Sequence, residues 1–130
     1  MLPLARPGLW IAGACALCVL IVVGSLLPGP LVAAVGISDK LEHAGSYFLL
    51  TLWLGGMLER RRYLAAAVAA VLLGGSLEVA QRLLTTTREA SLPDLAANAS
   101  GIALALALAY LGLGGWAGRV ERWLGVAPPG

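Results

Sequence analysis

The stretch SDKLEHAGSYFLL, residues 38–50, begins with polar and charged side chains and then becomes apolar. An acid, a base and the only histidine of the chain (Asp39, Lys40 and His43) lie within its first six residues. An ionised side chain deep in a bilayer costs about 2.5–3.5 kcal/mol, so these groups are expensive if the apolar run enters a membrane. The rest of the sequence indicates whether these groups have a function.

The composition of the chain is that of a membrane protein. Its 130 residues are 59% hydrophobic and 12% charged, with a mean hydropathy of +0.86, whereas soluble domains are about 45–50% apolar and about a quarter charged. The net charge of +2 is too small to indicate nucleic-acid binding. Cys15 and Cys18 lie in an apolar run without further ligands nearby, so we expect no metal there. For the chain as a whole we also expect neither a bound metal nor a cofactor.

Four apolar segments are long enough to cross a bilayer, whose core of about 30 Å requires about 20 helical residues. They cover residues 9–27, 41–58, 63–81 and 95–116. The last one alternates Ala and Leu as a strand would, but a strand in lipid must close into a barrel, and three other long apolar runs argue against one. The first is long for a signal peptide, so we expect it to be retained. We predict an all-α membrane protein with four transmembrane helices in a single domain, residues 1–130.

The arginines predict the orientation of these helices. One alternating set of loops holds six basic residues: Arg6, Arg60, Arg61, Arg62, Arg119 and Arg122. The other set holds Lys40, Arg82 and Arg88. Because basic residues are enriched in cytoplasmic loops, we predict that both termini are cytoplasmic and that the loops around 28–43 and 82–94 face outward.

Polar residues from three of the predicted helices converge on the outward side. At 100° per residue, they form one stripe on each helix. The stripes are Asp39, His43 and Tyr47 on the second helix, Glu78 and Gln81 on the third, and Asp94, Asn98 and Gly101 on the fourth. These stripes predict a single outward-facing polar pocket.

Each polar residue also has a structural interpretation. Asp39 and Asp94 fit helix starts, where an acid satisfies free N–H groups and the helix dipole. Glu78 and Arg82 fit an i,i+4 ion pair, and Asn98 fits a hydrogen bond between packed helices. Such pairing explains why polar groups persist in a membrane, but not why an acid, an imidazole and a phenol gather at one face.

His43 is the strongest candidate for a functional residue. Asp39 lies one turn before it and Tyr47 one turn after it. A carboxylate would orient the ring and raise its basicity, and a phenol could share its proton. The cluster is therefore interpreted as a site.

Three blocks of the sequence together resemble the VanZ-like family of small bacterial membrane proteins. The blocks are SDKLEHAGSYFLL, GGSLEVAQRLL and REASLPDLAANASGIALA, which span residues 38–105 in order. The positions that match the family pattern are Asp39, Lys40, His43, Tyr47, Glu78, Gln81, Arg88, Ser91, Asp94, Asn98 and Gly101. The family is named for a member associated with resistance to the glycopeptide teicoplanin. The resemblance implies a multi-pass protein of the bacterial cytoplasmic membrane and cell envelope.

The first functional hypothesis is a binding protein. Its ligand would be an amphiphile at the outer face, such as a lipid-linked cell-wall precursor or a lipophilic glycopeptide. Lys40 and Arg88 would contact a phosphate or carboxylate, and apolar helix walls would hold the tail. Partners would thus be membrane lipids or such a ligand. Gly114 and Gly118, at small-xxx-small spacing, fit close helix packing within the chain or in a homodimer.

Two alternatives remain open. An intramembrane hydrolase or transferase would use His43 as base, Asp94 as acid and Glu78 or Asp39 to orient the imidazole. No serine or cysteine nucleophile has a recognisable setting, and a lone histidine among acids is an incomplete metal site. A small transporter would use Glu78 or His43 to carry protons, although the inner half lacks a matching polar path.

Overall fold

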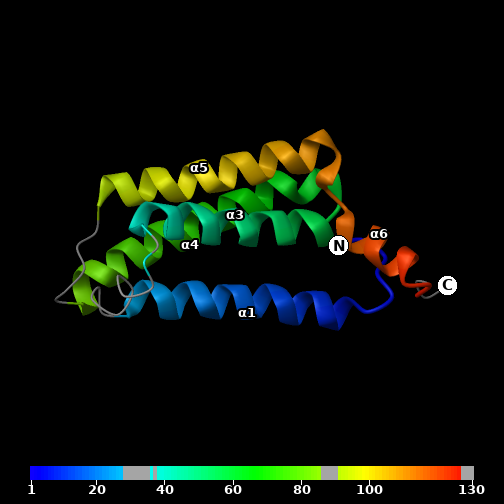
Figure 1. Cartoon of the computed structure of the whole chain (residues 1–130), viewed down its shortest axis with the longest axis horizontal. Helices are drawn as coiled ribbons and strands as arrows, with labels where there is room; N and C mark the ends of the chain where they lie inside the picture. Colours follow the sequence, from blue (N-terminus) through cyan, green and yellow to red (C-terminus); the bar gives the residue numbers. More distant parts are fainter. Residues whose placement is uncertain (28–35, 37, 86–90, 127–130) are drawn as a thin grey trace.

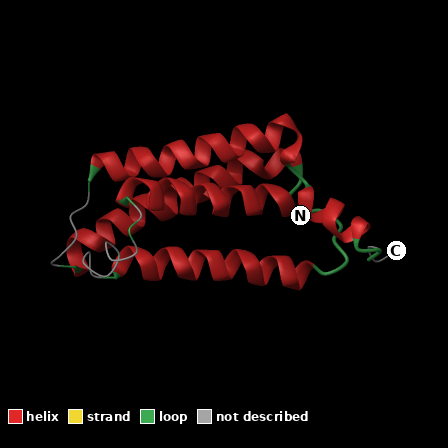
Figure 2. Ribbon diagram, in the orientation of Figure 1, coloured by secondary structure: helices red, strands yellow, loops and turns green. Residues whose placement is uncertain are grey.

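The chain forms a bundle of four long helices that lie side by side, followed by a short helix at one end (Figure 1). The computed structural model describes residues 1–27, 36, 38–85 and 91–126. Within these residues the regular elements are helical and none is a strand (Figure 2). In chain order they are α1 (Pro7–Leu26), α3 (Asp39–Met57), η1 (Arg60–Arg62), α4 (Tyr63–Leu84), α5 (Leu92–Leu108), the π-helix η2 (Ala109–Leu113) and α6 (Trp116–Trp123).

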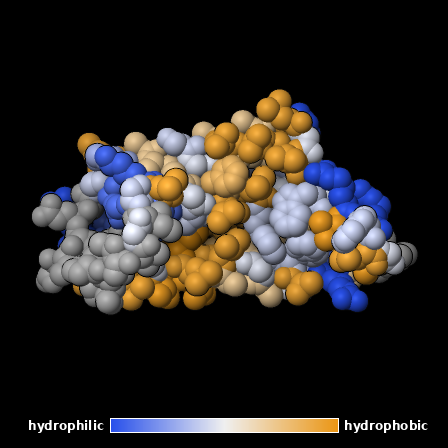
Figure 3. Space-filling model, in the orientation of Figure 1, coloured by the Kyte–Doolittle hydropathy of each residue, from blue (hydrophilic) through white to orange (hydrophobic). Residues whose placement is uncertain are grey.

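Three helical stretches are long and apolar enough to cross a membrane: Pro7–Leu26, Arg60–Leu84 and Leu92–Leu113. They carry large apolar side chains on the outside of the bundle, such as Leu20, Leu72 and Leu104. The space-filling view agrees, because strongly hydrophilic residues gather towards the two ends of the visible face and apolar ones lie between them (Figure 3). The described fold is all-helical, as predicted, and three of its helical stretches are compatible with a membrane.

Helix α3 is absent from these three stretches because its first turns carry Asp39, Lys40 and Glu42. It packs against α1, α4 and α5, and its side chains at Tyr47 and Leu50 are only 2% exposed. The most polar of the long helices is therefore shielded by the three more apolar ones.

The helix starts are capped by serines. The Ser38 Oγ accepts from the Leu41 N–H at 3.3 Å, and the Ser91 Oγ accepts from the Asp94 N–H at 3.2 Å. Serine is a favoured N-cap because its oxygen satisfies an N–H that has no partner in the first turn. The expected cap at Asp39 is thus corrected to Ser38, and Asp39 becomes the first residue of α3.

Helices α3 and α5 approach each other closely at Gly101. A Cβ atom at this position would lie 2.0 Å from the Ala44 carbonyl oxygen, which is far inside van der Waals contact. Only glycine permits this approach of the two backbones. The contact holds the polar stripes of α3 and α5 against each other.

The helix predicted over residues 95–116 ends earlier than expected. Helix α5 runs to Leu108 and continues only as η2, because Gly112 (φ +119°) and Gly115 (φ +70°) adopt conformations that favour glycine and turn the chain. The short α6 then begins at Trp116. Gly114 packs under a side chain: a Cβ there would lie 2.0 Å from the Tyr63 hydroxyl oxygen.

The end of the bundle that holds both termini is closed by Glu121 of α6 (Figure 1). Its carboxylate accepts hydrogen bonds from Ala5 N (2.7 Å), Arg6 N (3.0 Å) and Trp10 Nε1 (2.8 Å). Burial opposes ionisation of this carboxyl, but the bonds from Trp10, Ala5 and Arg6 outweigh it and hold its pKa below the usual range. These bonds fix α6 to the start of α1.

Three tryptophans fill the same end of the bundle. The rings of Trp10, Trp53 and Trp116 contact one another with centroids 5.2–5.5 Å apart. The Trp53 Nε1 donates to the Trp10 carbonyl oxygen, and the Trp116 Nε1 donates to the Leu52 carbonyl oxygen. The indole N–H groups of a largely apolar cluster are thereby satisfied.

Candidate functional site

The polar stripes meet at the opposite end of the bundle from the termini. This end combines the start of α3, the end of α4 and the start of α5 (Figure 1). His43, Glu78, Gln81 and Asn98 are all buried there, at 8% exposure or less. Buried polar groups on three separate helices must satisfy one another, so their hydrogen bonds define the site.

His43 is oriented by Asn98. The His43 Nδ1 and the Asn98 Oδ1 are 3.1 Å apart, and both side chains are buried. A carbonyl oxygen only accepts, so Nδ1 carries the proton in this bond and the neutral ring keeps a lone pair on Nε2. Sequence analysis expected Asn98 to form a packing hydrogen bond. In the structure the partner of Asn98 is His43 on α3, and this hydrogen bond sets the tautomer of the histidine.

The other ring nitrogen of His43 faces acids. Its Nε2 lies 3.8 Å from the Asp39 Oδ1, one helical turn earlier. One ligand-capable atom each from Asp39, His43 and Asp94 lie within 4.8 Å of one another. Asp39 is half exposed and Asp94 partly buried, so the group lies at the edge of the bundle. The packing of α3 against α5 brings together residues that are 51 positions apart in the sequence.

Tyr47 has a different environment from the one expected. Its hydroxyl is buried without a hydrogen-bond partner in the described part of the protein. The side chain lies near Gly74 of α4, where a Cβ would be 3.3 Å from the Tyr47 Cζ. The idea that this phenol shares a proton with His43 is therefore wrong, since the Nδ1 is bonded to Asn98 instead.

Glu78 and Gln81 connect the helices around the site. The Glu78 Oε2 accepts from the Ser91 N–H at 3.1 Å, so it holds the residue that caps α5. The Gln81 Nε2 donates to the Ser25 carbonyl oxygen at 2.8 Å, which joins α4 to the last turns of α1. Both side chains thus position the elements that carry the acids and the histidine.

The remaining candidates divide into three groups. Ser91 and Gly101 act through the cap and the close helix contact described above. Lys40 is exposed in the first turn of α3, as is Arg82 near the end of α4. Arg88 and parts of the loops predicted to face outward (residues 28–35, 37 and 86–90) lie outside the described residues.

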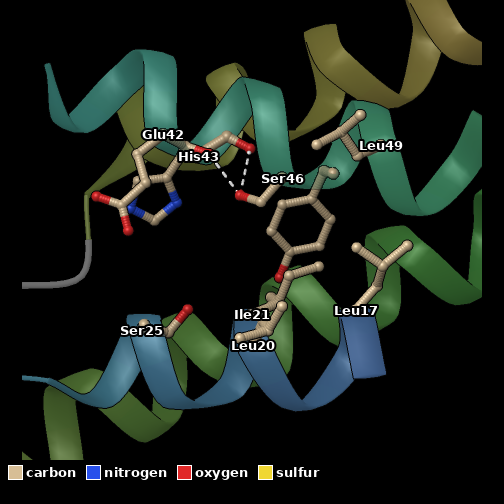
Figure 4. A pocket seen from close by; sticks show the side chains of 10 residues that line it. Leu17, Leu20, Ile21, Ser25, Glu42, His43, Ser46 and Leu49 are labelled. Carbon is tan, nitrogen blue, oxygen red and sulfur yellow. Dashed lines mark hydrogen bonds between the residues drawn. The ribbon is translucent and has the colours of Figure 1, made fainter. Parts of the chain in front are cut away.

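A pocket of about 180 Å³ lies between α1 and α3 at this end of the bundle. One side is apolar and the other carries polar groups (Figure 4). His43 belongs both to the pocket and to the group that it forms with Asp39 and Asp94. The lining residues are Leu17, Leu20, Ile21, Gly24, Ser25, Glu42, His43, Ser46, Tyr47 and Leu49. The Ser46 hydroxyl contributes no free donor, because it donates to the carbonyl oxygens of Glu42 and His43.

Sequence analysis missed the contribution of α1 to this pocket. Every turn of α1 is apolar, so its sequence does not indicate which face of the helix lines the pocket. Ser25 was the available signal, because it interrupts the apolar run two residues before its end at Leu27. Its carbonyl oxygen is the acceptor for Gln81.

No protein-family model, curated protein or solved structure matches the chain. The chemistry of the site therefore has to be inferred from its own geometry. It offers a histidine of fixed tautomer beside two carboxylates, next to a small pocket with an apolar wall.

Proposed function

We propose that this chain is a multi-pass protein of the bacterial cytoplasmic membrane, similar to the VanZ-like family, in which α1, α3, α4 and α5 all cross the bilayer. The 19 residues of α3 span about 28 Å, close to the thickness of the hydrocarbon core. Both termini and η1 lie at one end of the bundle (Figure 1), and this end is assigned to the cytoplasm because arginines are enriched there. The polar site then faces outward.

The proposed function is the binding of an envelope amphiphile, and the pocket between α1 and α3 is the observation that carries it. Leu17, Leu20 and Ile21 provide an apolar wall for a hydrocarbon chain, while Glu42 and His43 provide polar contacts on the opposite side (Figure 4). Pockets for whole drug-sized ligands measure roughly 300–1,000 Å³. A pocket of about 180 Å³ suits part of a lipid tail, with the head group at the polar edge.

The charge of the pocket narrows the ligand class. Glu42 lines it, so a hydroxyl or amine of a head group matches this side better than a phosphate does. Lys40, exposed at the start of α3, and Arg88 are the cations proposed for an anionic group further out. Lipid-linked cell-wall precursors and lipophilic glycopeptides combine these features, which is the basis for a role in glycopeptide resistance.

The test fills the pocket without disturbing the fold. A Cβ at Gly24 would lie 3.5 Å from the Glu42 Oε1, an ordinary contact, so Gly24→Leu is expected to fold and to extend into the pocket. Gly75→Leu is the matched control, because a Cβ at Gly75 of α4 meets no atom within 4 Å. The wild type and both variants are purified, mixed with a bacterial envelope-lipid extract and analysed by native mass spectrometry.

We expect the wild type and Gly75→Leu to retain a lipid that Gly24→Leu loses. Equal retention by all three proteins would show that the lipid binds the outer surface, and retention by none would contradict the proposal. Susceptibility of cells to teicoplanin, with and without the protein, then tests the role in resistance.

A second candidate function is catalysis on such a lipid. The grouping of Asp39, His43 and Asp94 favours it, because an unprotonated imidazole nitrogen beside carboxylates is a general base. The same lipid mixture tests this possibility. A lipid whose mass changes only with the wild type, and not with Asp94→Asn, would identify an enzyme.

A further inference from the structure

We propose that Asp39, His43 and Asp94 bind a divalent transition-metal ion such as Zn²⁺ at the polar end of the bundle. This inference is independent of amphiphile binding, because two of the three residues, Asp39 and Asp94, lie outside the lining of the pocket. It assigns a ligand role to two acids that lie in the first turns of α3 and α5.

The first argument is the spacing of the donor atoms. One atom each from Asp39, His43 and Asp94 lie within 4.8 Å of one another. Zinc is bound by nitrogen and carboxylate oxygen at about 2.0–2.2 Å, which holds such atoms roughly 3–4 Å apart in a tetrahedral site. Asp39 is half exposed, so its side chain has room to rotate by the small amount that this requires.

The second argument is the orientation of the histidine. His43 is 7% exposed, and its Nδ1–H is bound by the Asn98 oxygen. Nε2 is the nitrogen left for a ligand, and at 3.8 Å from the Asp39 Oδ1 it is beyond hydrogen-bond distance. Metal-binding histidines commonly have this arrangement, in which the second ring N–H is held by an oxygen acceptor that fixes the tautomer. Asn98 takes the position of that acceptor.

The third argument is electrostatic. Asp39, His43 and Asp94 bring two carboxyl groups and an imidazole nitrogen to the same space. A metal cation among them would be attracted by the carboxylates, at an end of the bundle where the surrounding helices are apolar.

The donor set indicates the class of metal. Mg²⁺ and Ca²⁺ prefer oxygen donors alone, whereas imidazole nitrogen favours zinc and other first-row transition metals. Three protein ligands leave a fourth tetrahedral position open, as in catalytic zinc sites. Because His43 also lines the pocket, this open position would lie beside whatever the pocket binds.

The experiment measures zinc directly. The purified chain in detergent is treated with EDTA, desalted and incubated with Zn²⁺, and bound zinc is quantified by elemental mass spectrometry and by competition with a chelating dye. We expect a single zinc ion per chain, loss of this binding in His43→Gln and Asp94→Asn, and about 10–100-fold weaker binding in Asn98→Leu through the misplaced imidazole.

Glu42→Gln is the matched control, because it removes one negative charge from the same end of α3 without removing a proposed ligand. The Glu42 carboxylate faces Gly24 of α1. If Glu42→Gln weakens zinc binding as much as Asp94→Asn does, the ion is held by general negative charge and the proposal fails. It also fails if the wild type retains no zinc.

Asp94→Asn remains decisive even if the buried His43→Gln variant does not fold. The structural bond of Asp94 uses its backbone N–H, so the substitution preserves it. Lipid retention measured in EDTA separates the two proposals, because amphiphile binding can survive there while the zinc signal is lost.

Discussion

The His43 Nδ1 donates to the Asn98 Oδ1 across 3.1 Å, and this buried bond joins α3 to α5 at the centre of the polar site. Replacement of Asn98 by Leu leaves the imidazole N–H without its acceptor. A buried donor without a partner costs about 1–3 kcal/mol, so we expect Asn98→Leu to lower the free energy of unfolding by that amount. Thermal or denaturant unfolding in detergent measures the loss.

The tautomer of His43 gives a second readout of the same bond. The chain contains a single histidine, so ¹⁵N-histidine labelling yields one imidazole spectrum. We expect the proton on Nδ1 in the metal-free wild type and a different distribution in Asn98→Leu. Ser100→Ala, an exposed position on α5, is the control and should change neither measurement. A wild-type ring protonated on Nε2 alone would contradict the assignment.

Gly101 should tolerate no side chain. In Gly101→Ala the new methyl group would lie 2.0 Å from the Ala44 carbonyl oxygen, a backbone atom that cannot rotate away. The helices must separate, and overpacking of this kind costs about 1–3 kcal/mol or more. We expect a markedly lower melting temperature than for Gly75→Ala, which meets no atom within 4 Å. Similar melting temperatures would show that α3 and α5 are further apart than described.

Tyr47→Phe should be neutral or stabilising. The Tyr47 hydroxyl is buried without a hydrogen-bond partner in the described part of the protein, so its removal relieves a desolvation cost. We expect the free energy of unfolding to rise by up to about 1 kcal/mol, measured by denaturant titration in detergent. A loss of stability instead would mean that the hydroxyl is bonded in the folded protein.

Glu121 should make the stability of the bundle depend on pH. Its pKa is lower in the folded protein than the unfolded value of about 4.3. Its stabilising effect is therefore complete above about pH 4.3 and is lost as the pH falls through the folded pKa. We expect Glu121→Gln to lower the melting temperature at pH 7 and to make it less sensitive to acid.

Glu59→Gln is the control for Glu121. The pKa of Glu59 is also lowered, mainly by its hydrogen bond from Arg61, but this is an exposed pair on the surface. Exposed ion pairs contribute little to stability. If both variants melt at the same temperature at pH 7, the carboxylate of Glu121 is not what fixes α6 to α1.

Much of this fold could be predicted because a bilayer requires each helix that crosses it to have an apolar run of a certain length. Runs that end at a proline or at the triple arginine gave helix limits within a few residues of those of α1, α3 and α4. The end of α5 was missed because Gly112 and Gly115 lie in a sequence that is apolar throughout. A glycine stops a helix only if it adopts a positive φ, and composition does not reveal that.

The residues of the site could be predicted from the sequence, but the hydrogen-bond partners of these residues could not. Helical spacing placed His43 and Asn98 at facing positions, yet Asp39 and Tyr47 were the expected partners because they are neighbours in the sequence. The close contact at Gly101 decides otherwise, since it brings α5 near enough for Asn98 to reach the ring. The wall supplied by α1 carried no signal apart from Ser25, because an apolar helix has no preferred face.

The three hydrogen bonds to Glu121 also give α1 a fixed end. The 20 residues of this helix measure about 30 Å from the Trp10 end to the Ser25 end. The other end of α1 is joined to α4 by the hydrogen bond from the Gln81 Nε2 to the Ser25 carbonyl oxygen, so a tilt of about 5° that displaced this end by about 2.6 Å would also stretch that bond. The pocket lies towards that far end. A motion too small to break the tryptophan contacts would therefore change the width of the pocket by a large fraction of the diameter of an aliphatic chain. The width of the pocket therefore depends on the Gln81–Ser25 bond at one end of α1 as well as on the hydrogen bonds to Glu121 at the end that holds both termini.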